Sequence, residues 1–173
     1  MEEFKVKNVL GSRIMQRRKN LGIKQSELAE KLGVSETRAK VLLKSAIQQA
    51  ISDGYVTFIS GMARGIDLWA AEIVIEEREK NDNIHLVCAS PFNGFENRWS
   101  EHEQNVYRSI IEQADFVKFV SQHYYRACFQ VRNEWMVNHV SRVIAAYNGT
   151  KGGTKNTIEY ANRKEIFVEN ILD

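Results

Sequence analysis

Proline, cysteine and long apolar runs are scarce in this chain of 173 residues. Pro91 is the only proline, and it separates an apolar run from a polar loop that extends to Trp99. The two cysteines, Cys88 and Cys128, have no CxxC motif and no metal-ligand spacing to the histidines, so we expect reduced thiols in a cytoplasmic protein and no structural zinc. No apolar run approaches the roughly 20 residues of a membrane helix, and the N-terminus lacks the apolar core of a signal peptide. We therefore predict no membrane partner, no metal and no cofactor.

The composition is that of an ordinary soluble globular protein, but its charge is unevenly distributed. Hydrophobic residues make up 43% and charged residues 27%, which allows one full core, or one domain with a small appendage. Residues 1–50 hold 11 Lys and Arg against 5 Asp and Glu, whereas residues 51–173 hold 13 against 17. This asymmetry makes nucleic acid a candidate partner for the basic front alone. The alternative is a solvated pair of basic helices.

The basic front has the pattern of two short helices separated by a glycine turn. Residues 10–21 place Leu10, Ile14 and Leu21 on one helical face, and Gly22 follows as a stop signal. Residues 25–32 form a second predicted helix, and the turn at residues 33–35 leads into a third. Two short helices joined in this way are typical of a helix-turn-helix.

The stretches at residues 10–14, 17–19 and 25–35 resemble the XRE (Cro/C1-type) family of DNA-binding proteins. The resemblance implies that the third helix reads the DNA groove and that the second begins near a phosphate. Here the third helix is predicted to continue to Ser52 with an apolar stripe, and so to run into the next domain. We predict a helix-turn-helix-like segment at residues 1–38 and a second domain at residues 39–173. The candidate DNA-binding residues are Gln25, Ser26, Glu36, Thr37, Arg38 and Lys40.

From Leu42 onward, predicted helices alternate with short apolar strands. The strands are predicted at residues 56–59, 84–89, 116–120, 143–147 and 166–168, with helices ending at 53 and starting at 66, 100, 126 and 156. This alternation predicts an α/β, Rossmann-like fold, in which a mostly parallel sheet has helices on both faces. Ligands of such sheets bind beyond the carboxyl ends of the strands.

A glycine-containing segment, residues 60–67, joins a predicted buried strand to a predicted helix. Its two glycines allow a tight turn close to a ligand, and free N–H groups at the helix start can hold a phosphate. Its aspartate suits the helix dipole or a sugar hydroxyl. The alternative is a glycine turn and a helix start without a ligand. The candidate ligand-binding residues here are Ser60, Gly61, Arg64, Gly65 and Asp67.

Three further groups of candidates follow later strands. Glycines and threonines at the start of the last helix offer a second phosphate site, or a simple helix cap. An arginine–asparagine pair offers a bidentate phosphate contact, or an internal salt bridge. Two loop aromatics offer a stacking surface for a base, or cover for an edge of the core. These candidates are Gly152, Gly153, Thr154 and Thr157; Arg132 and Asn133; and Trp99 and Tyr124.

The region from Leu42 to the C-terminus resembles the YpsA-like branch of the SLOG superfamily, Rossmann-like proteins related to DprA and to the LOG nucleotide hydrolases. The resemblance implies a nucleotide-derived ligand, and relatives range from sensors of nucleotide signals to phosphoribohydrolases. The matching stretches are residues 58–72, Pro91 with Trp99, Ala114-Asp115, Tyr124, Cys128, Arg132-Asn133, Met136-Val137, residues 145–149, Gly152-Gly153-Thr154, Thr157 and Tyr160-Ala161.

The chain departs from this family pattern at its start. Family members begin with a central strand and a Thr-Gly-His-Arg-Pro loop, and this sequence contains no such motif. Residues 4–9 are one candidate replacement strand, in competition with the helical interpretation. Without that strand, the neighbouring strands would have unpaired main-chain groups. A partner chain or an inserted strand would pair with them, so a homo-oligomer is one of the alternatives. Asn138 and Asn148 stand where the family has aspartates.

Three functions follow from these patterns. The first is a regulatory or sensor protein that binds a nucleotide-like small molecule and couples it to DNA through the front. The second is a nucleotide N-glycosidic hydrolase of the LOG type, which needs a carboxylate beside the sugar. Only Glu72 and Glu159 are nearby candidates, and Lys151 replaces the proline of the LOG motif, so we assign no catalytic residue. The third is a simple DNA-binding regulator.

Overall fold

The computed structural model describes residues 34–172, with side chains from residue 37 onward. The chain divides into two compact units, Met1–Arg38 and Ala39–Asp173. The architecture described below is that of the second unit. The two helices predicted at residues 10–21 and 25–32, the candidate strand at residues 4–9, and the candidate residues Gln25 and Ser26 lie outside the described part.

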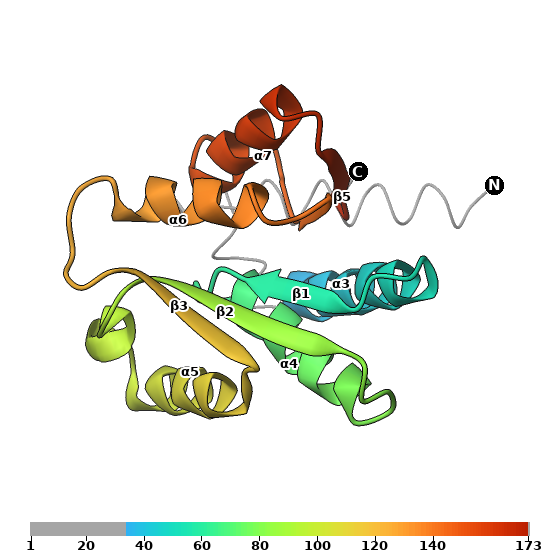
Figure 1. Cartoon of the computed structure of the whole chain (residues 1–173), viewed down its shortest axis with the longest axis horizontal. Coiled ribbons are helices and arrows are strands. Elements are labelled where there is room, and N and C mark those ends of the chain that lie inside the picture. The colour runs from blue at the N-terminus through green and yellow to red at the C-terminus, as the bar shows by residue number, and fades with distance from the viewer. Residues whose placement is uncertain (1–33, 173) are drawn as a thin grey trace, which may run out of the picture. The chain divides into compact units, whose positions relative to one another are not determined.

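Helices and short parallel strands alternate along the second unit (Figure 1). Strands β1, β2 and β3 pair in that order, and β4 pairs with β5, each pair in parallel. The α/β, Rossmann-like class predicted from the sequence is therefore confirmed. The elements are α3 (Val34–Ser52), β1 (Thr57–Ser60), α4 (Ile66–Arg78), β2 (His85–Phe92), the short helix η1 (Phe95–Arg98), α5 (Glu101–Gln113), β3 (Phe116–Ser121), α6 (Cys128–Val137), β4 (Arg142–Ala145), α7 (Gly153–Arg163) and β5 (Phe167–Asn170).

The predicted single sheet is divided into two. Within residues 34–172, the three-stranded sheet ends at β1 and the two-stranded sheet consists of β4 and β5. Helices α4 and α5 cover one face of the three-stranded sheet, and α6 lies across its other face (Figure 1). Helix α7 packs on α6 and on the two-stranded sheet. The layers of a Rossmann-like fold are present, but among the described strands β1 and β4 each pair along one edge alone.

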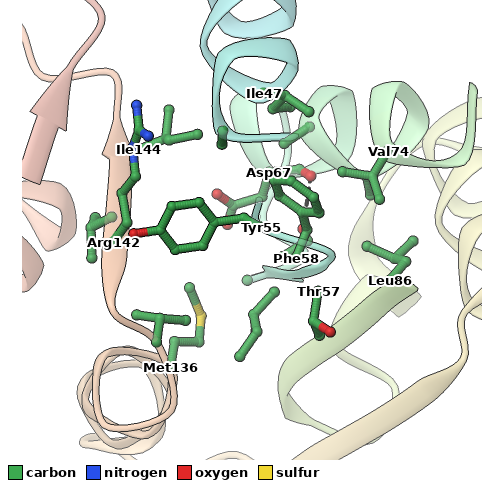
Figure 2. Close-up of a pocket in the computed structure, with 18 of the residues that line it drawn as sticks. Ile47, Tyr55, Thr57, Phe58, Asp67, Val74, Leu86, Met136, Arg142 and Ile144 are labelled. Atoms are coloured by element: carbon green, nitrogen blue, oxygen red, sulfur yellow. Dashed lines mark hydrogen bonds between the residues drawn. The ribbon is translucent and has the colours of Figure 1, made fainter. Parts of the chain in front are cut away.

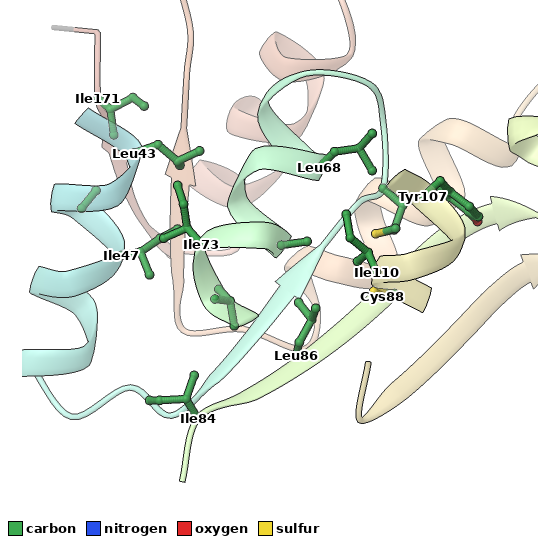
Figure 3. Packing of buried hydrophobic residues seen from close by; sticks show 14 residues of the cluster. Leu43, Ile47, Leu68, Ile73, Ile84, Leu86, Cys88, Tyr107, Ile110 and Ile171 are labelled. Atoms are coloured by element: carbon green, nitrogen blue, oxygen red, sulfur yellow. The ribbon is translucent and has the colours of Figure 1, made fainter. Parts of the chain in front are cut away.

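The hydrophobic core lies between α3, α4, α5 and the three-stranded sheet (Figure 3). The apolar stripe of α3 contributes Leu43 and Ile47, each 2% exposed, which pack near Ile73 of α4. Burying side chains of this size stabilises a fold by about 1.5–3 kcal/mol each. Strand β2 is covered on both faces, as expected for the central strand of a parallel sheet.

The helices differ in how their N-termini are capped. Helix α5 begins with a capping box, in which the Ser100 hydroxyl accepts the Glu103 N–H and the Glu103 carboxylate accepts the Ser100 N–H. Helices α4 and α7 begin differently, because glycines, Gly65 and Gly152, occupy their N-cap positions and offer no side chain to the first-turn N–H groups. These two uncapped starts follow strands β1 and β4.

Candidate functional site

The loop between β1 and α4 is held in one conformation by side-chain hydrogen bonds. Ser60 Oγ donates to the Asp67 carbonyl at 2.7 Å and accepts the Met62 N–H at 3.2 Å. The Asp67 carboxylate accepts the Ala63 N–H at 3.0 Å. Gly65 has φ of +83°, a conformation that favours glycine. The loop is therefore formed in advance of any ligand, and Asp67 already has a main-chain partner.

Arg132 joins this loop to helix α6. One guanidinium nitrogen donates to the Gly61 carbonyl, Nε donates to Asn133 Oδ1 at 2.8 Å, and Nη1 lies 3.7 Å from the Asp67 carboxylate. Arg132 is only 6% exposed. Burial lowers the pKa of its guanidinium, and the negative charge of Asp67 opposes that effect. Of the two roles open to Arg132, an internal contact is thus the one that the geometry displays.

The position of the Arg132 guanidinium leaves no room for a side chain at position 61. A Cβ at position 61 would lie 2.5 Å from Arg132 Nη1 and 2.7 Å from Asp67 Oδ2, closer than side-chain contacts allow. The glycine therefore permits the guanidinium to approach the main chain. The sequence motif predicted close approach of a ligand at this position, and the neighbour that approaches is a side chain of the protein.

The second glycine loop lies beside the same helix. A Cβ at Gly153 would be 3.8 Å from the amide nitrogen of Asn133, the residue that also accepts from Arg132. Thr157 donates its hydroxyl to the Gly153 carbonyl at 2.9 Å. Gly152, Gly153 and Thr154 are exposed to solvent. One arginine–asparagine pair therefore brings together the loops that follow β1 and β4. We call the surface formed by residues 60–67, 132–133 and 152–157 the glycine rim.

Trp99 and Tyr124 belong to an aromatic cluster near the glycine rim. The Arg64 guanidinium lies 5.7 Å from the centre of the Trp99 ring. Tyr124 is 65% exposed and makes an edge contact with Phe92 at 5.7 Å. Sequence analysis missed other members of this cluster, among them Phe92, Phe95 and Phe129, although the closely spaced aromatics that follow Pro91 were a usable signal.

A cavity of about 450 Å³ extends from the glycine rim between β1 and β4 (Figure 2). Four of the predicted ligand residues line it: Ser60, Gly61, Asp67 and Thr157. The rest of its lining is mostly apolar and comes from α3, α4, α6 and the two strands. The other ligand-binding candidates do not line it: these are Arg64, Gly65, Trp99, Tyr124, Arg132, Asn133, Gly152, Gly153 and Thr154.

The other candidates are dispersed. Thr37 and Arg38 are exposed, and the Lys40 ammonium lies 4.7 Å above the Trp69 ring; the side chain of Glu36 is not described. Within residues 34–172, no three His, Cys, Asp or Glu side chains gather closely enough to ligate a metal ion. Among the same residues, none of the helices has the length and apolarity that crossing a bilayer requires.

Comparison with known proteins relates most of the chain to one family. A family model described as the YspA SLOG family matches residues 17–170. UPF0398 proteins of Staphylococcus aureus strains JH9, Mu3 and COL are each 31% identical to the chain over 111 residues, which make up 63% of this chain and 59% of the relative. The matched part thus spans less than two thirds of these relatives, and their names state no activity. The helix-turn-helix resemblance stays a prediction, since most of its residues precede the described part.

Proposed function

Because the chain belongs to the YspA SLOG family, we propose that it binds a nucleotide-derived ligand whose phosphate lies at the glycine rim. The observation that carries the proposal is the position of α6. Its Arg132 contacts Gly61 and its Asn133 lies beside Gly153. One helix thus lies beside both glycine loops, and each loop leads into a helix start with no side-chain cap. Main-chain N–H groups at helix N-termini are effective ligands for phosphate.

The other residues of the rim take different roles in this proposal. Arg132 positions the loop and makes no direct phosphate contact, because its guanidinium is already engaged inside the protein. Arg64 is exposed beside the Trp99 ring, so it supplies a positive charge that a phosphate can reach. Trp99 and Tyr124 supply faces on which a base can stack. Thr154 adds a hydroxyl at the exposed start of α7.

Binding is favoured over N-glycosidic hydrolysis by where the two candidate carboxylates lie. Glu72 lines a different hollow, between α4 and α5, together with His102. Glu159 is exposed and pairs with Lys155 at 3.5 Å. The third nearby carboxylate, Asp67, already accepts the Ala63 N–H. The hydrolase is tested by incubating the chain with nucleoside monophosphates, where release of free base would replace the sensor proposal with the enzyme.

Thermal-shift titration of the full chain tests the binding proposal. Nucleoside mono-, di- and triphosphates and dinucleotides are compared with inorganic phosphate. A ligand at 100 times its Kd stabilises the folded state by about 2.7 kcal/mol, which raises the melting temperature by about 8 °C in a chain of this size. If no nucleotide raises the melting temperature, the proposal fails.

The variant Gly152→Ala tests whether the ligand binds at the rim. Gly152 has an extended backbone with φ of 161°, and a Cβ there would meet nothing within 4 Å. The variant should therefore fold normally and keep the melting temperature of the free protein. The added methyl group would keep a phosphate away from the amides, and we expect at least tenfold weaker nucleotide binding. Asn162→Ala, an exposed change near the other end of α7, is the matched control and should bind like the parent.

A regulatory output through DNA is a further part of the proposal. It is motivated by the basic charge of residues 1–50 and by the exposure of Thr37 and Arg38 on α3. Binding to a random-sequence duplex library, followed by affinity measurements on enriched sequences at several salt concentrations, tests it. A DNA reader should discriminate between sequences and lose affinity steeply with salt. Binding without sequence preference would reduce the front to a basic surface.

A further inference from the structure

Two sheet edges face one cavity. Within residues 34–172, β1 pairs with β2 alone and β4 pairs with β5 alone. The cavity that begins at the glycine rim is lined by residues 54–61 on one side and by residues 140–144 on the other. The free edges of β1 and β4 therefore border the same space (Figure 2).

The register identifies which main-chain groups point into this space. The Val56 carbonyl accepts the His85 N–H of β2. Successive residues of a strand direct their N–H and C=O groups to opposite sides, so Thr57 and Ile59 direct theirs away from β2. The same reasoning applies to β4, where the Ala145 carbonyl accepts the Ile171 N–H. Arg142 and Ile144 therefore direct their groups away from β5, toward the cavity.

The side chains around the cavity are apolar both above and below the plane of the strands. Ile47, Val74 and Leu86 line it from the side of α3 and α4, and Met136 and Val137 line it from α6. Sheet strands that are covered on both faces consist of continuous apolar residues. An occupant of this space would therefore carry aliphatic side chains on both of its faces.

A buried donor for which the described residues offer no partner lies at the amino end of β4. The Arg142 side chain is 11% exposed and lines the cavity. Its two terminal nitrogens bond to Asp53 at 2.6 Å and Glu169 at 2.5 Å, but its Nε is buried and has no acceptor among residues 34–172. Buried donors are normally satisfied. A carbonyl oxygen of an extended chain beside β4 is an acceptor of the right kind.

We propose that this cavity, here named the strand slot, receives one extended segment of a different protein, parallel to β1 and β4. The segment bonds through its main chain to Thr57 and Ile59 on one side and to Arg142 and Ile144 on the other. It is four to six residues long, uncharged and rich in valine, isoleucine or threonine, as in other cases of binding by strand addition. The parallel direction matches both existing sheets.

The chain's own undescribed part is a poor match for this chemistry. Residues 1–33 contain no run of more than two consecutive apolar residues. The candidate strand at residues 4–9 has Lys5 and Lys7 on one face, which would place two ammonium groups among the apolar side chains that line the slot. A second copy of the chain carries the same residues, so this mismatch applies to it too, and we assign the occupant to a different protein.

A labelled probe peptide tests the proposal on the full chain. The probe is a heptapeptide of five valine, isoleucine and threonine residues between two terminal lysines, with blocked ends and a fluorophore, and binding is followed by fluorescence polarisation. The control peptide has identical side chains, with N-methyl groups on two central residues. We expect saturable binding of the probe and at least tenfold weaker binding of the control. N-methylation removes peptide N–H groups that would donate to the main-chain carbonyls of β1 and β4.

Amide hydrogen exchange then locates the bound probe. The amides of Thr57, Ile59 and Ile144 should exchange at least tenfold more slowly with the probe bound, whereas that of Phe58, which faces β2, should not change. Thr57→Pro removes one N–H that faces the slot and leaves the hydrogen bonds between β1 and β2 in place. It should weaken binding of the probe at least tenfold. Val168→Pro is the matched control, because the Val168 N–H faces the outer edge of β5. This variant should bind the probe like the parent.

Several outcomes would overturn the proposal. Equal binding of the N-methylated peptide would show an apolar groove without strand pairing. Binding that appears only after deletion of residues 1–33 would show that the chain fills the slot itself. A stable dimer by sedimentation whose own contacts protect the Thr57 and Ile144 amides would assign the slot to a second copy. Failure of the probe to protect these amides would also refute it, independently of nucleotide binding at the glycine rim.

Discussion

Replacing Arg132 by methionine tests how the glycine rim is held together. Methionine keeps most of the buried volume but removes the positive charge and every donor. The Gly61 carbonyl and Asn133 Oδ1 then lose a charged partner, and the Asp67 carboxylate loses a guanidinium 3.7 Å away. We expect the loop after β1 to loosen from α6 and the free energy of unfolding to fall.

The size of this loss follows from the burial of the group. A hydrogen bond to a charged group contributes about 1.5–3 kcal/mol, and leaving a buried acceptor unpaired has a penalty of similar size. Methionine recovers part of this through apolar contact, so we expect a net loss of about 3 kcal/mol. At about 3–4 °C per kcal/mol for a chain of this length, the melting temperature should fall by about 10 °C.

Urea and thermal unfolding followed by circular dichroism measure this effect. Arg64→Met is the matched control, since it removes an arginine near the same rim whose side chain is 60% exposed and whose ion pair with Glu103 spans 3.7 Å. Exposed pairs contribute about 0–1 kcal/mol, so this control should be nearly neutral. If Arg132→Met changes the melting temperature by no more than the control does, the guanidinium does not hold the loop, and our interpretation of the rim is wrong.

Three further predictions concern stability and thiol chemistry. Gly61→Ala should lower the melting temperature by several degrees, because its methyl group would meet Arg132 Nη1 at 2.5 Å, and the loss should shrink in the Arg132→Met background; equal losses in both backgrounds would contradict the clash. A main-chain N–H of β2 holds the pKa of Asp115 below its usual value, so the stability it contributes is present above about pH 4 and is lost as pH falls through the folded pKa. Urea titrations at pH 5 and pH 3 should therefore show a smaller acid loss in Asp115→Asn than in the parent, and identical losses would refute this. Burial raises the pKa of Cys88 to about 12 and Cys128 is fully buried, so neither thiol should react with Ellman's reagent at pH 8 until urea unfolds the protein, and rapid labelling of the native protein would contradict their burial.

The local elements of the second unit were predictable because their signals are local. Apolar periodicity and glycine stops placed most helices and strands within a few residues of their observed bounds. The proline signal was wrong, because Pro91 was expected to end its strand and β2 continues through it to Phe92. The last helix is an exception, since it begins at Gly153 and not at the predicted Asn156. Glycine is a poor helix former, and the pattern placed both glycines in the loop, whereas Gly153 forms the first residue of the helix.

The internal role of Arg132 was not predictable from its neighbours in the sequence. Its partner Gly61 is 71 residues away, and both a phosphate contact and an internal contact fitted the local pattern. The choice depends on how α6 crosses the sheet, which is a tertiary property. The gap between β1 and β4 is a different case. The absence of the family's first strand predicted unpaired neighbours, and the described residues have free edges at those strands.

Contacts made by two arginines lie near the two ends of the strand slot. Arg142 of β4 bonds to Asp53, just after α3, and its guanidinium lies 5.7 Å from the Tyr55 ring. Arg132 of α6 bonds to Gly61 at the opposite end of β1. The separation of the two sheets is thus maintained by the folded protein itself. A guest chain would enter a preformed space, and its affinity would not be reduced by the free energy of opening one.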